Sequence, residues 1–183
     1  MNTAVQLFWE RGYEGTSIGD LTEAMGIRPT SLYAAFSDKK ALLREAAEAY
    51  GRSPEGSLIT RALAEESTAH AAFTRILHEA AVIYTDPSYP PGCLAITTAT
   101  NVTPQDAGIA TFLRDVRDAD LKRFESRLQT AQADGELPAS ANPKTLAQYF
   151  AAIMQGMSLQ ARDGATRKTL THIADEALRT WPH

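Results

Sequence analysis

Apolar side chains recur three or four residues apart along most of this sequence, the spacing that places them on one face of an α-helix. The clearest run near the C-terminus is Leu146, Phe150, Ile153 and Met157. No alternating apolar and polar run bounded by turns indicates a strand. The segment CLAITTATNV is partly β-branched, but the sequence offers no second strand to pair with it. We therefore predict an all-α protein in which that segment is a short buried helix.

Signals for helix ends divide the first residues into short helices. The first apolar stripe stops at Gly12, a residue type common just after a helix C-terminus. Ser17 and Asp20 have the spacing of a capping box, and Gly26 closes a second helix of little more than two turns. Pro29 suits the first position of a third helix, because its fixed φ is helical and its missing N–H is not needed there.

The fourth helix is expected to follow Ser37, a good N-cap residue, and to run from Asp38 towards Tyr50. The stretch GRSPEG comes next, and its cluster of glycine, serine and proline makes it the best linker candidate. We therefore predict two domains, a head formed by residues 1–50 and a larger helical domain formed by residues 51–183.

The larger domain carries further helical patterns. Apolar residues spaced by three and four run from Phe73 to Ile83, until the prolines of DPSYPPG force a break. A long helix is expected to open at Thr103 and Pro104 and to run towards Gly135. Two helices close the chain, each with an apolar stripe. These last two helices are expected to form a homodimer interface, unless both stripes are buried within one monomer.

The composition limits the class of protein. Hydrophobic residues make up 44% of the 183 residues, and no apolar run is long enough to span a bilayer. The first residues lack the basic start and cleavage site of a signal peptide, so we expect a cytoplasmic protein with no membrane contact. Cys93 is the single cysteine, which excludes an intramolecular disulfide. The formal charge of −4 argues against a general polyanion binder, so any nucleic-acid surface must be a local patch.

Three short helices with a tight turn at Gly26 form a candidate helix-turn-helix. In such a unit the later helix enters the major groove of DNA with its N-terminal residues in front. Here those residues are Arg28, Pro29, Thr30 and Ser31. An arginine can bind guanine through two hydrogen bonds, and hydroxyl side chains can contact bases or phosphates.

The stretch LFWERGYEGTSIGDLTEAMGIRPTSLYAAFSDKKALL resembles the DNA-binding head of the TetR family of transcriptional repressors. The resemblance is specific over about 45 residues and looser beyond them, although the PPGCL segment is similar to one branch of the family. The matching positions are Phe8-x-x-x-Gly12-Tyr13, Thr16-Ser17-Ile18, Leu32-Tyr33-x-x-Phe36 and Lys39 with Leu42.

The resemblance implies a homodimer that binds double-stranded, palindromic operator DNA and releases it when a small-molecule effector, here of unknown identity, occupies the C-terminal domain. By position it assigns phosphate contacts to Tyr33 and Lys39, a DNA backbone contact to Thr16 or Ser17, and base contacts to Arg28, Thr30 and Ser31. A phosphate partner would explain why Lys39 lies where the helix dipole disfavours a cation.

Other roles are open for several of these residues. Ser17 is explained by helix capping alone, and Tyr33 could cover the small core. Arg28 and Lys39 could be solvated surface charges. Ala35 stands where many members of the family carry a histidine, and residues 1–50 contain five basic against seven acidic residues. We therefore expect modest affinity for DNA that depends on where the few cations lie.

The sequence indicates less about an effector site than about the DNA-binding head. Candidates to line an effector cavity are Phe73, His78, Tyr84, Cys93, Phe112, Phe150, Met154 and Gln155. Aromatic and methionine residues at helical spacing fill cores equally well, so no ligand class follows. Cys93 is expected at a helix start, where a thiol can become reactive, or else buried and inert. The histidines show no metal-ligand spacing, and we assign no metal and no cofactor.

The sequence thus favours a ligand-responsive repressor. Two alternatives stay open at this point: a helical ligand-binding or interaction protein without specific DNA binding, and a thiol-based electrophile or redox sensor acting through Cys93. The sequence shows no ordered nucleophile and base, no phosphate loop and no metal cluster, so we do not expect an enzyme.

Overall fold

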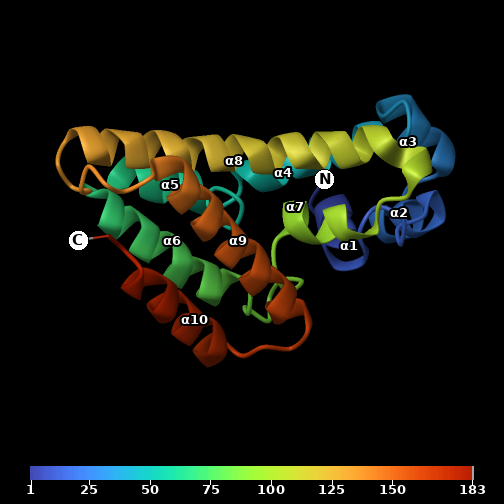
Figure 1. Cartoon of the computed structure of the whole chain (residues 1–183). Coiled ribbons are helices and arrows are strands. Elements are labelled where there is room, and N and C mark those ends of the chain that lie inside the picture. The colour runs from blue at the N-terminus through green and yellow to red at the C-terminus, as the bar shows by residue number, and fades with distance from the viewer. Residues whose placement is uncertain (183) are drawn as a thin grey trace. The chain divides into compact units, whose positions relative to one another are not determined.

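The structure is a computed structural model that describes residues 1–182, without the side chains of Asn101 and Pro104. His183, one of the four histidines, lies outside the described residues. Every regular element in them is a helix, which confirms the all-α prediction (Figure 1). The α-helices are α1 (Asn2–Arg11), α2 (Ile18–Met25), α3 (Pro29–Ala35), α4 (Lys39–Arg52), α5 (Leu58–Glu65), α6 (Ala69–Ile83), α7 (Leu94–Thr97), α8 (Ala107–Ala133), α9 (Pro143–Arg162) and α10 (Arg167–Arg179), with short 3-10 helices η1 (Thr98–Asn101) and η2 (Pro104–Asp106).

The chain forms two compact units. The first contains Met1–Gly56 together with Cys93–Val116, and the second contains Ser57–Gly92 and the chain from Arg117 onward. We expected a head of residues 1–50. In the structure the head also takes in residues 93–116, because apolar side chains such as Leu94 and Leu113 are buried in it. Helix α8 is one continuous helix that begins in the first unit and ends in the second (Figure 1).

The expected end signals are present in the first unit. Gly12 ends α1 with φ 72° and ψ −176°, a region of backbone space that is nearly closed to other residues. Ser17 and Asp20 form the capping box of α2, and Gly26 ends that helix in the left-handed conformation. One detail differs from our prediction. The N-cap of α4 is Asp38 rather than Ser37, because the Asp38 carboxylate accepts the Ala41 N–H at 2.7 Å.

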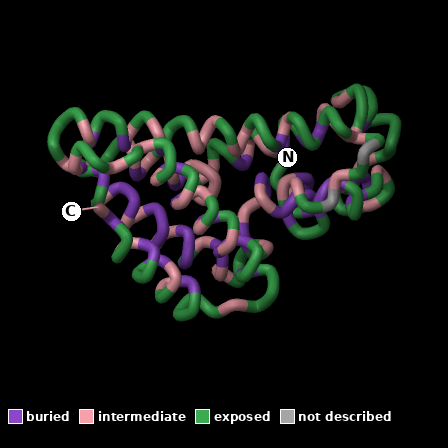
Figure 2. The backbone as a smooth tube through the Cα atoms, in the orientation of Figure 1, coloured by how far each residue is buried: buried purple, intermediate pink, exposed green. Residues whose placement is uncertain are grey.

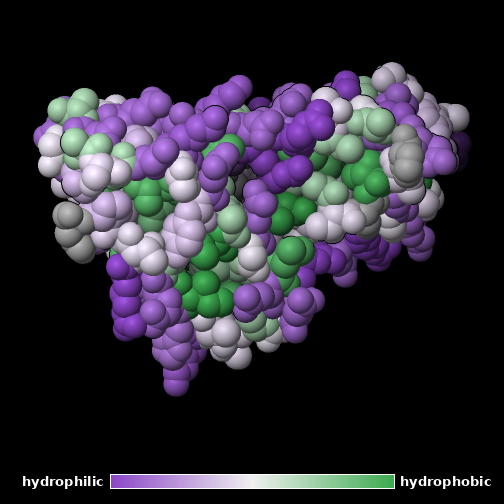
Figure 3. All heavy atoms as spheres, in the orientation of Figure 1, coloured by the Kyte–Doolittle hydropathy of each residue, from purple (hydrophilic) through white to green (hydrophobic). Residues whose placement is uncertain are grey.

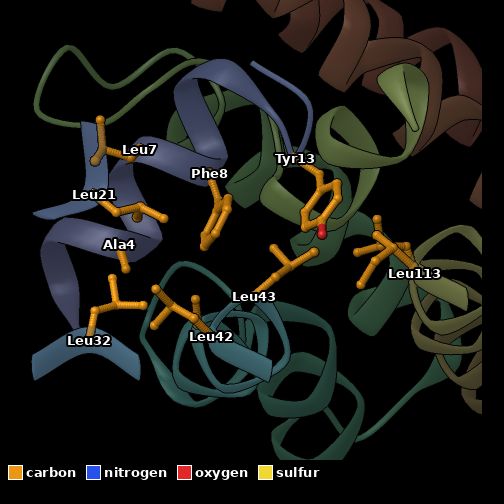
Figure 4. Close-up of a cluster of buried hydrophobic side chains, with 11 residues drawn as sticks. Ala4, Leu7, Phe8, Tyr13, Leu21, Leu32, Leu42, Leu43 and Leu113 are labelled. Carbon is orange, nitrogen blue, oxygen red and sulfur yellow. The ribbon is translucent and has the colours of Figure 1, made fainter. Parts of the chain in front are cut away.

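The first unit is built around one apolar core. Figure 4 shows side chains from α1, α2, α3 and α4 gathered in one cluster, with Leu113 of α8 at its edge beyond Tyr13. The fully buried members include Phe8, Leu21, Leu32 and Leu42. Because α2 and α3 are short, each depends on this core for its position rather than on its own helical stability.

The segment CLAITTATNV is helical, as predicted, and forms α7 and η1. Its buried threonines are satisfied by backbone carbonyls: the Thr98 hydroxyl donates to Phe8 O at 3.2 Å, and the Thr97 hydroxyl donates to Cys93 O at 2.8 Å. The β-branched residues that resemble a strand therefore serve to bury a short helix against α1 without leaving polar groups unpaired.

The second unit has an aromatic core. The Phe73 ring of α6 lies 4.9 Å from the Phe124 ring and 4.8 Å from the Phe150 ring, and Trp181 closes the cluster. Helix α6 is buried along much of its length, as the purple turns in Figure 2 show. Helix α10 packs against both α6 and α9. Helix α5 is an element that we did not predict from the sequence.

No helix in the described part of the chain combines the length and the apolar character that crossing a membrane requires.

Replacing Gly12 by alanine is expected to lower the free energy of unfolding by about 1–3 kcal/mol, because the side chain forces a strained backbone. Gly51 lies in α4, and a Cβ added there would meet no atom of another part of the protein within 4 Å. Gly51→Ala is therefore expected to raise the free energy of unfolding by up to about 1 kcal/mol. Urea unfolding of the two variants measures both effects. A Gly12→Ala protein with the wild-type urea midpoint would contradict this account of the turn.

Candidate nucleic-acid interface

Helix α3 presents most of its surface to solvent. Leu32 is its single buried side chain. Arg28, Thr30 and Ser31 at the start of the helix are exposed, and Tyr33 is 51% exposed. A helix held by one apolar residue, with its polar N-terminal residues free, can enter a major groove and offer those residues to base edges. The structure therefore brings four of the seven predicted DNA-binding residues together on one exposed helix.

The turn between α2 and α3 sets the direction of this helix. Gly26 adopts φ 66° and ψ 31°, and Ile27, the next residue, packs against the core of the first unit. The Ile27 N–H donates to Thr22 O at 3.0 Å, which completes the C-terminal cap of α2. Pro29 then starts α3 without needing a hydrogen bond from its nitrogen.

Lys39 is bound within the head. Its Nζ donates to Tyr13 O at 3.0 Å and to Thr16 O at 3.1 Å, and it lies 3.9 Å from the centre of the Tyr13 ring. These two carbonyl oxygens, rather than a phosphate, offset the unfavourable effect of the helix dipole on a cation at this N-terminus. An ammonium group has three N–H donors, so one donor remains for a further acceptor. The predicted phosphate contact of Lys39 stays a prediction.

Thr16 and Ser17 have local roles in the turn before α2. Thr16 is fully buried, and its hydroxyl donates to Gly12 O at 2.8 Å, so this arrangement does not leave it free for a phosphate. Ser17 is exposed, and its hydroxyl accepts the Asp20 N–H at 3.0 Å. The same pairing lowers the pKa of Asp20, since hydrogen bonds from Ser17 stabilise its charged form. Of the two, Ser17 is the residue that DNA can reach.

The positive charge of the head is largely committed to internal contacts. Arg28 is the one cation of residues 1–50 for which the described residues hold no partner. The other four have partners within the first unit: Lys39 has the two carbonyls, Arg11 has Asp20, Lys40 has Asp106, and Arg44 has the ring of Phe112.

Tyr13 lies among acidic groups. Burial raises its pKa to about 12, and the nearby carboxylates of Asp106, Asp38 and Glu14 add to the effect. The phenol therefore stays neutral at physiological pH. Glu14 contacts Thr103, 89 positions away, and Asp106 contacts Lys40, more than sixty positions away. Nothing in the local sequence pattern could have indicated these contacts.

The predicted ligand residues fall in both units. Cys93 and Phe112 belong to the first unit, where both are half-buried. The other six belong to the second unit. Four of these six are buried, among them Phe73 and Phe150 in the aromatic core. Gln155 is exposed on α9, and His78 pairs through Nε2 with Asp175 at 2.9 Å. The prediction that they line an effector cavity stays a prediction.

The second unit also has surface hollows that the sequence did not indicate. One lies between α9 and α10, where Figure 3 shows apolar residues gathered. Its lining consists of Tyr149, Ile153, Thr169, His172, Ile173, Glu176 and Ala177. A second lies between α5 and α8 and is basic, with Lys122, Arg123 and Arg127 in its lining. None of the eight predicted ligand residues lines either hollow.

Two family comparisons cover most of the chain. Residues 1–46 match the family described as bacterial regulatory proteins, tetR family. Residues 69–177 match the family described as tetracyclin repressor-like, C-terminal domain. The boundaries of the first match agree with the position of the exposed α3 helix inside the head.

Individual proteins are similar over nearly the full length. The HTH-type transcriptional repressor ComR of Escherichia coli strain K12 is 33% identical over 182 residues, covering 100% of this chain and 87% of the relative. The HTH-type transcriptional repressor BdcR of the same organism is 24% identical over 183 residues, covering 98% and 87%. Among solved structures, a cysteine mutant of the TetR family regulator CifR, complexed with 26-base-pair operator DNA, is 36% identical, with a TM-score of 0.94 and coverage of 99% and 94%.

The Lys39→Met variant keeps the alkyl chain and removes the ammonium group. We expect its free energy of unfolding to fall by about 1–3 kcal/mol, because two carbonyls lose a charged donor. Arg52→Met removes a cation from the exposed Arg52–Glu48 pair, whose atoms are 3.9 Å apart, and is expected to change stability by no more than about 0.5 kcal/mol. Urea unfolding compares the two, and equal effects would show that the carbonyl contacts of Lys39 contribute nothing.

Proposed function

Because this chain belongs to the TetR family of bacterial transcriptional regulators, we propose that it is a repressor that binds a palindromic operator as a homodimer and releases it when a small molecule binds its C-terminal domain. The observation that supports this most is α3, a helix with one buried residue and an exposed N-terminus that carries Arg28, Thr30 and Ser31. A regulator with 36% identity and a TM-score of 0.94 has been solved with operator DNA.

Sequence reading by this helix depends most on Arg28. Its guanidinium is exposed and has no partner in the described part of the chain, so it is free to pair with a guanine in the major groove. Thr30 and Ser31, in the first turn of α3, can donate to or accept from base edges and phosphates. Because hydroxyl side chains are short, Thr30 and Ser31 can contact base edges only if α3 inserts deeply into the major groove.

Phosphate binding in this proposal falls to Tyr33, Ser17 and the third donor of Lys39. The Tyr33 side chain on α3 is 51% exposed, and its phenol can donate to a phosphate beside the groove. Few free cations mean few released counterions, so the salt dependence of binding is expected to be shallow for each head. Affinity then depends on two heads binding together.

The dimer in this proposal forms through α9 and α10. The hollow between them has an apolar floor with a polar rim, and Leu159 of α9 is 42% exposed. An exposed apolar strip on two neighbouring helices is suited to a four-helix interface with the same strip of a second copy. Two copies would place two α3 helices on the two halves of a palindrome.

The alternatives from the sequence have less support. The exposed helix α3 favours a DNA-binding protein over a helical protein without specific DNA binding. Cys93 is half-buried and packs in the cluster of Trp9, Tyr50 and Leu94, a setting that favours a role in packing. We place the activity of the protein in the cytoplasm of a bacterium, where operator DNA is found.

Mobility shift with the DNA upstream of the protein's own gene, repeated across salt concentrations, tests the proposed function. Arg28→Ala is expected to lower operator affinity by about 1–3 kcal/mol, because a paired guanine loses its partner. The affinity of Arg28→Ala for random DNA should fall no further than that of Arg52→Ala, a variant that removes the same charge elsewhere. Equal losses on operator and random DNA would contradict base reading by Arg28, and no specific complex even at low salt would contradict the repressor itself.

The Ile153→Asp variant tests the dimer, because it places a charge in the apolar floor between α9 and α10. We expect a monomer in light scattering and a loss of operator binding. Gln148→Asp adds the same charge at an exposed position on another flank of α9 and is expected to stay dimeric. A dimeric Ile153→Asp protein would move the interface elsewhere.

A further inference from the structure

The basic hollow on the surface of the second unit lies between α5 and α8 (Figure 1). Its volume is about 490 Å³, which is within the range of small-molecule sites. Helix α8 supplies Lys122, Arg123 and Arg127 to it, and none of the described lining residues is acidic. Such a cluster of cations is unexpected in a chain whose formal charge is −4. The charge of this hollow therefore favours an anion.

Two of the three cations are held in place by carboxylates outside the lining. Arg123 Nη1 lies 2.7 Å from Asp120 Oδ1. Arg127 Nη2 lies 3.5 Å from Glu136 Oε1 and donates to Ser67 O at 3.2 Å. The Arg127 side chain is only 15% exposed. The two arginines are therefore fixed in direction, and each has a negative partner.

Lys122 is the cation that carries the unbalanced charge. It is exposed, and the described part of the chain holds no partner for it. Glu65 and Glu66, which follow Ala64 in sequence, pair with Arg75 of α6 at 2.8 and 2.9 Å instead. Three cations in the lining and two carboxylate partners leave one positive charge, which matches the single carboxylate group of a ligand.

Three hydroxyl groups in the lining are also available to a ligand. The side chains of Thr60 in α5 and of Ser126 and Thr130 in α8 have no hydrogen-bond partner in the part of the chain that the structure describes. A threonine within a helix can donate to the carbonyl one turn earlier, as Thr22 does to Ile18 O at 2.9 Å. Hydroxyls without that bond can donate to an anion.

The polar and apolar groups of the hollow come from different helices. Lys122, Ser126 and Thr130 are spaced by four residues, so they lie on one face of α8 and span about 12 Å along it. Leu63 and Ala64 supply apolar surface from α5. A ligand that fills the hollow therefore places its anionic group on α8 and an apolar body against α5.

We propose that this hollow binds a small organic acid, a monocarboxylate with a short apolar chain, whose carboxylate accepts hydrogen bonds from Lys122 and from a neighbouring hydroxyl. The site goes beyond the proposed repressor function and does not depend on it. It also differs from the predicted effector cavity, since none of the eight predicted ligand residues lines it.

Isothermal titration calorimetry of the full chain, without DNA and at low salt, tests the site. The probe is hexanoate. The comparison ligands are hexanol and hexylamine, which have the same chain with a neutral or a positive end. We expect one hexanoate bound per chain, and binding of both comparison ligands that is weaker by at least about tenfold, because they lack the charged acceptor.

A pair of variants at Ala64 isolates the effect of charge. Ala64→Glu places a carboxylate in the hollow at an exposed position of α5, and Ala64→Gln adds a side chain of the same size without the charge. We expect hexanoate to bind Ala64→Glu at least about tenfold more weakly than Ala64→Gln, because like charges repel in the hollow.

Variants of Lys122 test the proposed partner of the carboxylate. Lys122→Ala is expected to weaken hexanoate binding by at least about fivefold, whereas Lys122→Arg keeps the charge and retains binding. Lys144→Ala is the matched control, because it removes an exposed lysine of α9 that has no partner in the described residues. It is expected to bind hexanoate like the wild-type protein.

The inference is overturned by an absence of saturable hexanoate binding, or by hexanol binding as tight as that of hexanoate. It is also overturned if Ala64→Glu binds like Ala64→Gln, or Lys122→Ala like Lys144→Ala. All of these outcomes leave the repressor function intact, because operator binding is measured separately by mobility shift. A wild-type protein that binds hexanoate but no operator would support this site and contradict the proposed function.

Discussion

The ammonium group of Lys39, held by the carbonyl oxygens of Tyr13 and Thr16, fixes the geometry on which the DNA-binding head depends. It joins the turn after α1 to the start of α4, and α2 and α3 lie between these two points in the chain. The buried side chains of α2 and α3, chiefly Leu21 and Leu32, then pack between the two segments that Lys39 joins. Short helices with so few buried residues would not hold a direction by themselves.

The same contact determines how the head uses its charge. A net negative head that commits four of its five cations to internal partners has little long-range attraction for DNA. What remains is Arg28 at the tip of α3, where a guanidinium is suited to base recognition rather than to general phosphate binding. Under the proposed function, we expect such a head to discriminate between sequences more strongly than it binds DNA in general, with dimerisation supplying the affinity.

Much of the fold could be predicted from the sequence because its signals are local. The ends of α1, α2 and α3 depend on Gly12, Gly26 and Pro29, whose backbone preferences hold in any context. Helix α5 was missed because it is only eight residues long, and little more than two turns give a helical period few repeats. The choice of Ser37 over Asp38 as N-cap failed because both residue types cap well, and only the structure shows that the Asp38 carboxylate accepts the Ala41 N–H.

The residues of the candidate site also divide into those that local signals indicate and those that depend on tertiary contacts. The sequence by itself determined the all-α class and the candidate helix-turn-helix with Arg28, Thr30 and Ser31 at the start of its later helix, since these follow from helical period and end signals. The family resemblance added Tyr33, and the structure showed that it is exposed. Only the tertiary structure decided that Thr16 faces inward, that Lys39 holds carbonyls, and that residues 93–116 return to the head to contact Glu14 and Lys40. These facts depend on contacts between segments up to ninety residues apart, and local spacing carries no information about such partners.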